Sequence, residues 1–533
     1  MYEYGTKYTK HERGGLWALF AVLFVVTNTA CQWNVGSVNV QLVHTSTETN
    51  NPLDPVLIKT LRVSIKGDGL VLHRYEFDLK VGGGGTVEDV PVGSNRVLTV
   101  EGLDVSGYVR SRGISAPFEL KEGANRIYLF ISRVGEFSAP PAVTESDWAQ
   151  RYRTLMRSRR AFHTATVLTN GRLLVAGGIG APDPIDYLAP VGVNGALRTA
   201  ELFDPTAGAF QLSPNTTDCQ RGEDLCLLAG RAHHSASVLL PRSDVLLVGG
   251  EPEVNISADS TVTEYFEYAT NRFSDGPKMT VPRSRQASCA LISSSSQDWL
   301  FAGGRNTAFQ LTDSIELFEA DTGMITEVGK LSAARSGATA VAYSGGVVVI
   351  GGWETDTSQG PGGLKASNRV DRVEFGDGTT TVSPPFFLQE ARAEHTAVLL
   401  IDEQGAPKVF VCGGLSNNTT RAAIQSCEII DPIVEESTLR CDLDEPRWRH
   451  TATVLQSNRV LVSGGFQSGT LPAALNTAVL MNPLETCSKK QLSMVSRRAG
   501  HTATVLQNGM VVLVGGISTN TQMASEDYEI YNP

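Results

Sequence analysis

The chain has 533 residues, of which 45 are Lys or Arg and 56 are Asp or Glu, which gives a net charge of −11 at pH 7. This acidic balance argues against binding to nucleic acid and against electrostatic adsorption to anionic membranes, since both need clustered basic side chains. The length is sufficient for more than one domain, and eight cysteines are typical of an exported protein in an oxidising compartment.

The first 30 residues are typical of an export signal. Three basic residues precede an apolar run from Gly14 to Thr27 that is short for a membrane span. Small residues then lead directly to Cys31, and in this the segment resembles the cleavage site of bacterial lipoproteins. The resemblance implies lipidation of Cys31 and, with Gln32 next in the chain, a place in the outer membrane of the cell envelope. Plain secretion and an uncleaved anchor are the alternatives.

Residues 31–137 contain no repeat and have the pattern of β-strands throughout. Alternating apolar residues occur at 37–43, 61–65, 96–100 and 126–131, with Gly and Pro clusters between the strands. The size and strand spacing predict one β-sandwich, which resembles the Ig-like or transthyretin-like modules of exported bacterial proteins. Residues 138–147 include two adjacent prolines and are expected to form a linker.

From residue 148 onward one motif occurs seven times. Each copy begins with arginine, continues through two short β-branched and apolar strands, and ends with paired glycines, as in residues 498–516. The copies recur about every 50 residues, which is the size of a four-stranded propeller blade. The repeat positions are Arg160, Arg231, Arg283, Arg335, Arg392, Arg447 and Arg498; His163, His234, His395, His450 and His501; and Gly177, Gly178, Gly249, Gly250, Gly303, Gly304, Gly351, Gly352, Gly413, Gly414, Gly464, Gly465, Gly515 and Gly516.

A third strand of the Glu-apolar-aromatic type follows each glycine pair, as in residues 200–205 and 314–319. With this strand the motif resembles the kelch repeat over residues 148–533. The resemblance implies an all-β chain in which the β-sandwich is followed by a seven-bladed kelch-type β-propeller. The last copy stops at Pro533 after its third strand, so we expect residues 148–156 to supply the fourth strand and to close the ring.

The repeated glycines and histidines are interpreted as structural. Glycine allows the close approach and positive φ needed near a propeller axis, and no copy carries the Lys-Ser/Thr tail of a phosphate-binding loop. Histidine occupies the third position after the arginine in five copies, and Gln286 and Ala338 replace it in the others. Side chains spread once per blade around a ring lie too far apart to share one metal, so we expect a hydrogen bond within each blade and no metal or cofactor.

Six cysteines are assigned from their spacing. Cys219 and Cys226 flank a polar loop and are expected to close it, while Cys427 and Cys441 lie on neighbouring strands and are expected to form a second disulfide. Buried thiols are expected at Cys289 and Cys412. The sequence offers no partner for Cys487.

The longest insertions are expected on the propeller face formed by the loops between second and third strands. Long loops on a rigid scaffold commonly bind ligands, and this face combines carboxylates with two aromatic side chains. Its candidate binding residues are Asp183, Asp186, Tyr187, Glu251, Trp353, Glu354 and Asp356. They favour a non-catalytic scaffold that binds a protein partner, or alternatively a glycan that stacks on Trp353.

An enzyme is the less favoured alternative. Galactose oxidase and its relatives also place a seven-bladed propeller after a β-sandwich, but their copper site needs a ligand from a further C-terminal domain. Tyr343 is the exception among inner strands that otherwise carry few tyrosines, and the histidines follow the repeat. We therefore expect no catalytic residues.

Overall fold

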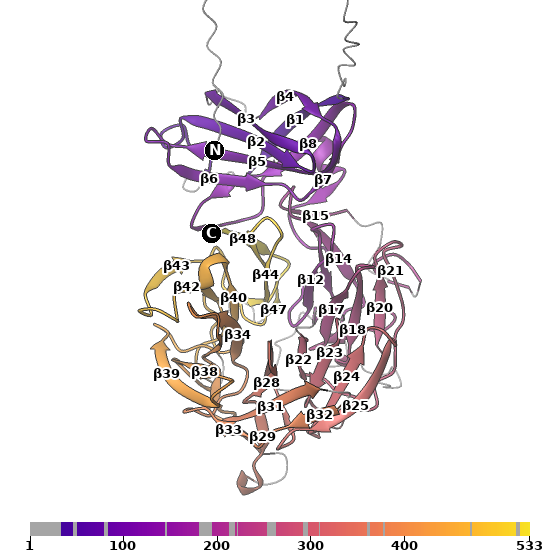
Figure 1. Cartoon of the computed structure of the whole chain (residues 1–533), viewed down its shortest axis with the longest axis vertical. Coiled ribbons are helices and arrows are strands. Elements are labelled where there is room, and N and C mark those ends of the chain that lie inside the picture. Colours follow the sequence, from indigo (N-terminus) through magenta and orange to yellow (C-terminus); the bar gives the residue numbers. More distant parts are fainter. Residues whose placement is uncertain are drawn as a thin grey trace, which may run out of the picture.

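The protein is all-β, as the sequence predicts: of the residues that the structure describes, 54% lie in strands and 2% in helices. The computed structural model describes residues 34–45, 51–78, 84–143, 146–180, 195–212, 219–220, 222–252, 263–291, 297–306, 308, 310–359, 363–376, 379–469, 472–518 and 523–533. Cys31 and the expected export signal lie outside these residues. Figure 1 shows a smaller N-terminal body above a larger body of many sheets.

The N-terminal body consists of two sheets around one apolar core. Valines and leucines at alternate positions of both sheets, such as Val38, Val63 and Leu98, are buried against each other in this core. The smaller sheet has the order β4 (Gly84–Pro91), β1 (Val35–Val43), β8 (Gly123–Phe130), with β1 and β8 parallel. The larger sheet has the order β3 (Leu70–Asp78), β2 (Thr60–Gly67), β5 (Gly93–Leu103), β6 (Val109–Ile114), β9 (Ser132–Arg133), and β7 (Phe118–Leu120) also pairs with β5.

Beside three smaller groups of short strands, the described residues beyond β9 form seven main antiparallel sheets, which we number in chain order. In strand order they are β12 (Thr164–Val167), β13 (Leu173–Ala176), β14 (Ala200–Asp204), β15 (Ala209–Gln211) and β11 (Tyr152–Arg153); β17 (Ser235–Leu239), β18 (Asp244–Val248), β20 (Glu264–Glu267) and β21 (Arg272–Asp275); β22 (Ala287–Ala290), β23 (Trp299–Ala302), β24 (Ser314–Glu319) and β25 (Met324–Lys330); β27 (Thr339–Tyr343), β28 (Gly346–Ile350), β31 (Arg369–Gly376) and β32 (Thr379–Val382), with β33 (Phe386–Phe387) also on β31; β34 (Thr396–Ile401), β35 (Pro407–Cys412), β38 (Ser426–Asp431) and β39 (Glu436–Asp442); β40 (Thr451–Val454), β41 (Val460–Ser463), β42 (Thr477–Met481) and β43 (Lys489–Ser493); and β44 (Thr502–Val505), β45 (Val511–Val514), β48 (Tyr528–Asn532) and β10 (Glu136–Ser138).

Short elements join the sheets. They are the pair β16 (Arg231–Ala232) and β19 (Glu251–Pro252); the row β26 (Arg335–Ser336), β29 (Trp353–Thr355), β30 (Leu364–Ala366), β36 (Leu415–Asn417) and β37 (Ala422–Ala423); the pair β46 (Ile517–Ser518) and β47 (Met523–Ala524); and the helices α1 (Ser146–Ala149), η2 (Thr357–Gln359) and η3 (Gln456–Asn458). Among the described residues no helix has the length and apolar character needed to cross a membrane.

The first strand of each sheet lies toward a common centre, and the fourth strands such as β21, β25 and β39 lie outside (Figure 1). Neighbouring first strands contact one another in chain order, and β44 of the seventh sheet contacts β12 of the first. Small Ala, Thr and Ser side chains dominate these strands, which lets seven of them approach one centre. Ser288 and Ser235 join the second and third sheets through their Oγ atoms at 2.8 Å.

A closed circle of seven backbone hydrogen bonds lies beside the starts of these first strands. Its members, which we call the axial ring, stand two positions after each repeat arginine and are Phe162, His233, Arg285, Gly337, Glu394, Arg449 and Gly500. Each amide donates to the carbonyl of the preceding member at 2.9–3.1 Å, and Phe162 donates to Gly500. All seven have φ between 50° and 63°, although five are not glycine. Such backbone is costly outside glycine, so the surrounding sheets hold it in place.

The prediction for the closing strand was wrong. Residues 148–156 do not pair with the seventh sheet; instead β11 pairs with β15 of the first sheet, and the Tyr152 hydroxyl donates to Asp204. The fourth strand of the seventh sheet is β10, whose Phe137 packs on Tyr531 with ring centroids 4.9 Å apart. Ser138 belongs to that strand, so the linker begins one residue later than expected. Phe137 of β10 lies opposite Tyr531, and this apolar contact favours β10 over residues 148–156 at the edge formed by β48.

The two bodies are fixed to each other by apolar packing and by hydrogen bonds. Phe130 of the N-terminal body belongs to the same buried cluster as Phe203, Phe210 and Tyr528 of the larger body. Its amide donates to the Thr206 carbonyl at 2.7 Å. The N-terminal body and the larger body are therefore held against each other at this interface.

Candidate functional site

The repeat arginines are buried and bind inside their own sheets. Arg392, for example, donates to the Gly413 carbonyl at 2.8 Å and to Glu428 on the third strand at 2.7 Å. Six of the seven sheets place a Glu or Asp at this third-strand position. In the sixth sheet Val479 occupies it, and Glu445 lies 3.5 Å from Arg447 instead. The arginine and the glycine pair thus act as structural anchors.

The repeat histidines join neighbouring sheets, which corrects the prediction of a bond within each blade. The Nε2 atom of each histidine lies 2.6–3.1 Å from the threonine hydroxyl that begins the preceding sheet, as in His450 with Thr396. Gln286 makes the corresponding bond to Ser235 at 3.2 Å. Burial, followed by the nearby Arg447, lowers the pKa of His450 to about 3, so the ring is neutral at pH 7.

The disulfides follow the prediction only in part. Cys219 pairs with Cys226, as expected. The expected bond between Cys427 and Cys441 is absent, because Cys427 pairs with Cys412 and Cys441 pairs with Cys487.

Register explains why spacing alone failed for the second disulfide. Cys427 faces Cys412 on one neighbouring strand and Cys441 on the other, so either bond was possible. Cys289 forms no disulfide, and burial raises the pKa of its thiol to about 12.

The candidate binding residues do not form one exposed surface. Asp183, Asp186 and Tyr187 lie outside the described residues. Trp353 is only 2% exposed, because pairing of β29 with β26 and β30 folds it into an apolar cluster with Trp448. Stacking of a sugar on Trp353 is therefore ruled out in this conformation.

Two further candidates, Glu354 and Asp356, bind side chains close to them in the fold, and a third, Glu251, lies at the centre of the molecule. Glu354 pairs with Arg369 at 3.3 Å and accepts a hydrogen bond from Ser367. Asp356 accepts a hydrogen bond from the Ser358 hydroxyl at 2.7 Å. Glu251 reaches the axial ring, where it meets Arg285 and Arg305 of the third repeat.

Five members of the axial ring are not glycine. Their side chains, together with those of Glu251 and Arg305, form a connected and mainly charged group that we call the axial cluster. Glu251 accepts from Arg285 Nε at 2.8 Å and from Arg305 Nη2 at 2.7 Å. Arg285 lies 3.2 Å from His233 Nε2 and 3.8 Å from Glu394. These contacts link the second, third and fifth sheets across the axis.

Arg449 completes the axial cluster. Its Nε donates to Glu394 at 2.9 Å, and its guanidinium carbon lies 4.4 Å from the centroid of the Phe162 ring. Phe162 in turn stacks on His233 with centroids 4.4 Å apart. The side chains therefore follow one another around the axis as their backbones do.

The axial cluster carries one net positive charge at neutral pH. Burial alone would raise the pKa of Glu394, but Arg449 and Arg285 hold it below its ordinary value. Glu251 is likewise held as a carboxylate by Arg285 against the effect of burial. Burial lowers the pKa of Arg449 to about 10 and keeps His233 neutral. Three guanidinium groups thus face two carboxylates.

Arg449 carries donors of this cluster that have no partner in the described part of the chain, beside Glu394, whose Oε1 atom accepts no hydrogen bond there. The Arg449 side chain is buried, with the whole residue 8% exposed, and within the described residues neither Nη1 nor Nη2 has a hydrogen-bond partner. The Nε1 group of Trp353 is also unpartnered there. The Trp353 ring lies near Gly337, where a Cβ atom would come within 3.4 Å of that ring and 2.9 Å of Glu394, the carboxylate that pairs with Arg449. Buried donors of this kind require an acceptor.

Sequence reasoning missed the axial cluster, although a signal was present. Between the repeat arginine and the histidine, one position holds Phe, His, Arg, Gly, Glu, Arg and Gly in turn. The arginine before this position and, in most copies, the histidine after it recur, whereas the residue at the position itself changes in charge from copy to copy. Its side chain therefore does not share the structural role of its neighbours. Among the described residues, no group of His, Cys, Asp and Glu is arranged to hold a metal ion.

No protein-family profile and no curated protein matches this chain.

Proposed function

We propose that this protein is a kelch-type, seven-bladed β-propeller preceded by a β-sandwich, and that it acts by binding. The seven antiparallel sheets, the contact between their first strands and the closed axial ring support the propeller architecture. The two sheets that share the N-terminal core support the sandwich. The export signal and Cys31 place the protein, in this proposal, at the cell envelope as a lipoprotein.

Binding is favoured over catalysis by the ionisation of the axial cluster. General acid–base catalysis works best with a group whose pKa lies near the working pH. The pKa of His233 lies well below that range, those of Glu251 and Glu394 are held below their ordinary values, and that of Arg449 is about 10. The cluster is suited to holding an anion and poorly suited to moving a proton.

The Nη1 and Nη2 groups of Arg449, unpartnered among the described residues, are the observation that carries the proposal. Arginine presents parallel N–H groups that match a carboxylate, and such charge-assisted bonds are strong where water is sparse. An acidic side chain of a protein partner supplies a carboxylate together with a peptide backbone for the surrounding loops. We infer that the partner is a protein whose Asp or Glu side chain enters the axial ring beside Phe162.

A pair of labelled peptides tests this function. The first carries a central Asp-Glu, the second carries Asn-Gln in the same frame, and fluorescence anisotropy measures their binding to the full chain. We expect the acidic peptide to bind at least tenfold more tightly. Arg449→Met should remove that preference, because methionine keeps the length and loses the charge.

The matched control is Arg272→Met, which removes the same charge from a side chain that is 58% exposed on an outer strand and paired with Asp224. The control should bind like the natural protein. Equal affinity for the two peptides, or equal loss in the two variants, would contradict the proposal.

A further inference from the structure

We propose that the cleft between the second and third sheets is a second binding site, and that it takes a neutral oligosaccharide. It lies at the ends of the strands opposite the axial ring, since the turn between β17 and β18 lines it. The inference is therefore independent of the proposed function.

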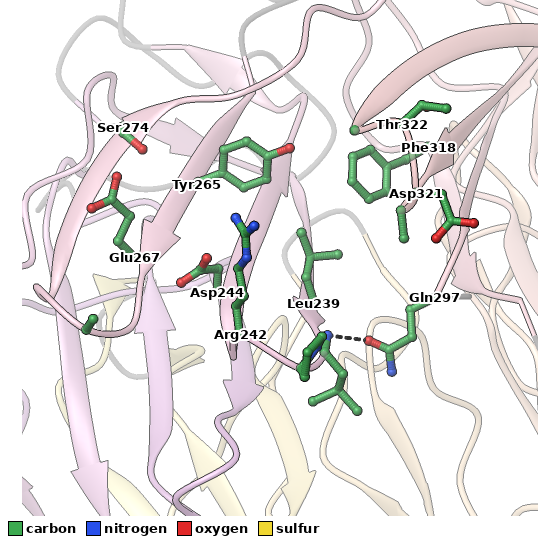
Figure 2. A pocket seen from close by; sticks show the side chains of 15 residues that line it. Leu239, Arg242, Asp244, Tyr265, Glu267, Ser274, Gln297, Phe318, Asp321 and Thr322 are labelled. Atoms are coloured by element: carbon green, nitrogen blue, oxygen red, sulfur yellow. Dashed lines mark hydrogen bonds between the residues drawn. The ribbon is translucent and has the colours of Figure 1, made fainter. Parts of the chain in front are cut away.

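The cleft has the size and the wall of a ligand site. Its volume is about 1060 Å³, at the upper end of the range of about 300–1,000 Å³ that is usual for small ligands. Figure 2 shows the rings of Tyr265 and Phe318 on neighbouring sheets, with Leu239 and Arg242 below them in this view. Tyr265 is partly exposed, whereas Phe318 is buried in the wall behind. An exposed aromatic face beside an open cleft can stack on the C–H face of a sugar ring.

The polar side chains of the cleft are held in place by backbone groups. Gln297 accepts a hydrogen bond from the Leu240 amide at 2.7 Å, drawn in Figure 2, which leaves its NH₂ group to donate. Asp244 accepts from the Tyr268 amide at 3.0 Å through Oδ1. Side chains fixed in this way lose little conformational freedom when a ligand binds.

Donors and acceptors are mixed along the cleft. Arg242 and Gln297 can donate, and Asp244, Glu267 and Asp321 can accept. Sugar hydroxyls both donate and accept, so a neutral sugar can satisfy both kinds of group at once. The excess of carboxylates disfavours an acidic polysaccharide. Burial, and then the nearby Asp244, raises the pKa of Tyr265, so its hydroxyl remains a donor at neutral pH.

Calorimetric titration of the full chain with neutral hexasaccharides of glucose and of N-acetylglucosamine tests the site, with polygalacturonate and hexalysine as the acidic and basic probes. We expect one neutral hexasaccharide to bind with one site per chain. Tyr265→Ala should weaken it at least tenfold, and Asp321→Ala, a change in an exposed turn, should weaken it severalfold. Tyr108→Ala, which removes a tyrosine side chain that is 68% exposed on the N-terminal body and outside the lining, is the matched control and should leave binding unchanged.

The outcomes separate this inference from the proposed function. Arg449→Met should bind the hexasaccharide like the natural chain, whatever its effect on peptides. Failure of every neutral probe to bind would overturn the inference, and so would binding that survives both Tyr265→Ala and Asp321→Ala. Binding of hexalysine in preference to every sugar would overturn it as well and reassign the cleft to a cationic peptide. Circular dichroism of each variant establishes that the loss is not one of folding.

Discussion

Replacing Glu428 by glutamine tests whether the buried arginine–carboxylate pairs hold the sheets together. Glu428 and Arg392 are both fully buried, and the carboxylate accepts from Arg392 at 2.7 Å, from the Gln389 and Glu390 amides at 2.8 and 3.1 Å, and from Ser437 at 2.6 Å. Both carboxylate oxygens of Glu428 accept hydrogen bonds. After Glu428→Gln, the new side-chain NH₂ group would therefore face one of these donors in either orientation of the amide. Breaking such a pair from one side costs about 3–5 kcal/mol.

The sixth sheet provides the matched control. Glu445 is 37% exposed and lies 3.5 Å from Arg447, which also donates to the Gly464 and Thr477 carbonyls. Arg447 is buried but Glu445 faces solvent, where water can replace the lost carboxylate contact, so Glu445→Gln should cost about 1 kcal/mol, less than the loss at Glu428. Urea unfolding of the full chain, followed by circular dichroism, measures both variants. Equal losses of stability in the two variants would refute the assignment of the repeat arginines as structural anchors.

Two further predictions concern the repeat glycines and histidines. Gly413→Ala should destabilise the protein by several kcal/mol, because the added Cβ atom would lie 2.6 Å from the Arg447 carbonyl oxygen. Gly405 also has positive φ but has open space around it, so Gly405→Ala should cost about 1–2 kcal/mol. Thermal unfolding measures both variants, and a larger loss of stability for Gly405→Ala would contradict this reasoning. The buried histidines remain neutral when folded and take up protons when unfolded, so stability falls as pH drops below about 6.5, by about 1.4 kcal/mol per pH unit for each histidine. His450→Gln, which copies the natural Gln286, should reduce that slope by the same amount between pH 6 and 5, and an unchanged slope would show that His450 is not buried as a neutral ring.

The sequence was most informative where one physical requirement recurs. The arginine, the small-residue strand and the glycine pair appear seven times, so local pattern predicted the strands and the all-β class. It failed where two segments compete for one edge. Both residues 136–138 and residues 148–156 contain aromatic residues beside polar ones, and local pattern does not show that Phe137 packs on Tyr531 and brings residues 136–138 onto β48.

The candidate site was harder to predict because it depends on side chains far apart in the chain. Glu251, Arg285, Glu394 and Arg449 come from four repeats, and no local pattern indicates that they meet. The prediction for Trp353 failed for a related reason. From the sequence, an aromatic residue directly after the glycine pair is expected in an exposed loop, but β29 pairs with both β26 and β30 and so buries this side chain. Cysteine spacing likewise cannot determine which neighbouring strand supplies the partner of Cys427.

A crystal structure of the full chain with the acidic peptide would test the role of Arg449 most directly. We predict a carboxylate of the peptide within hydrogen-bond distance of Arg449 Nη1 and Nη2, beside the ring of Phe162. Ordered water bridging Arg449 to Glu394, with the peptide bound elsewhere, would contradict the assignment of the axial ring as the binding site.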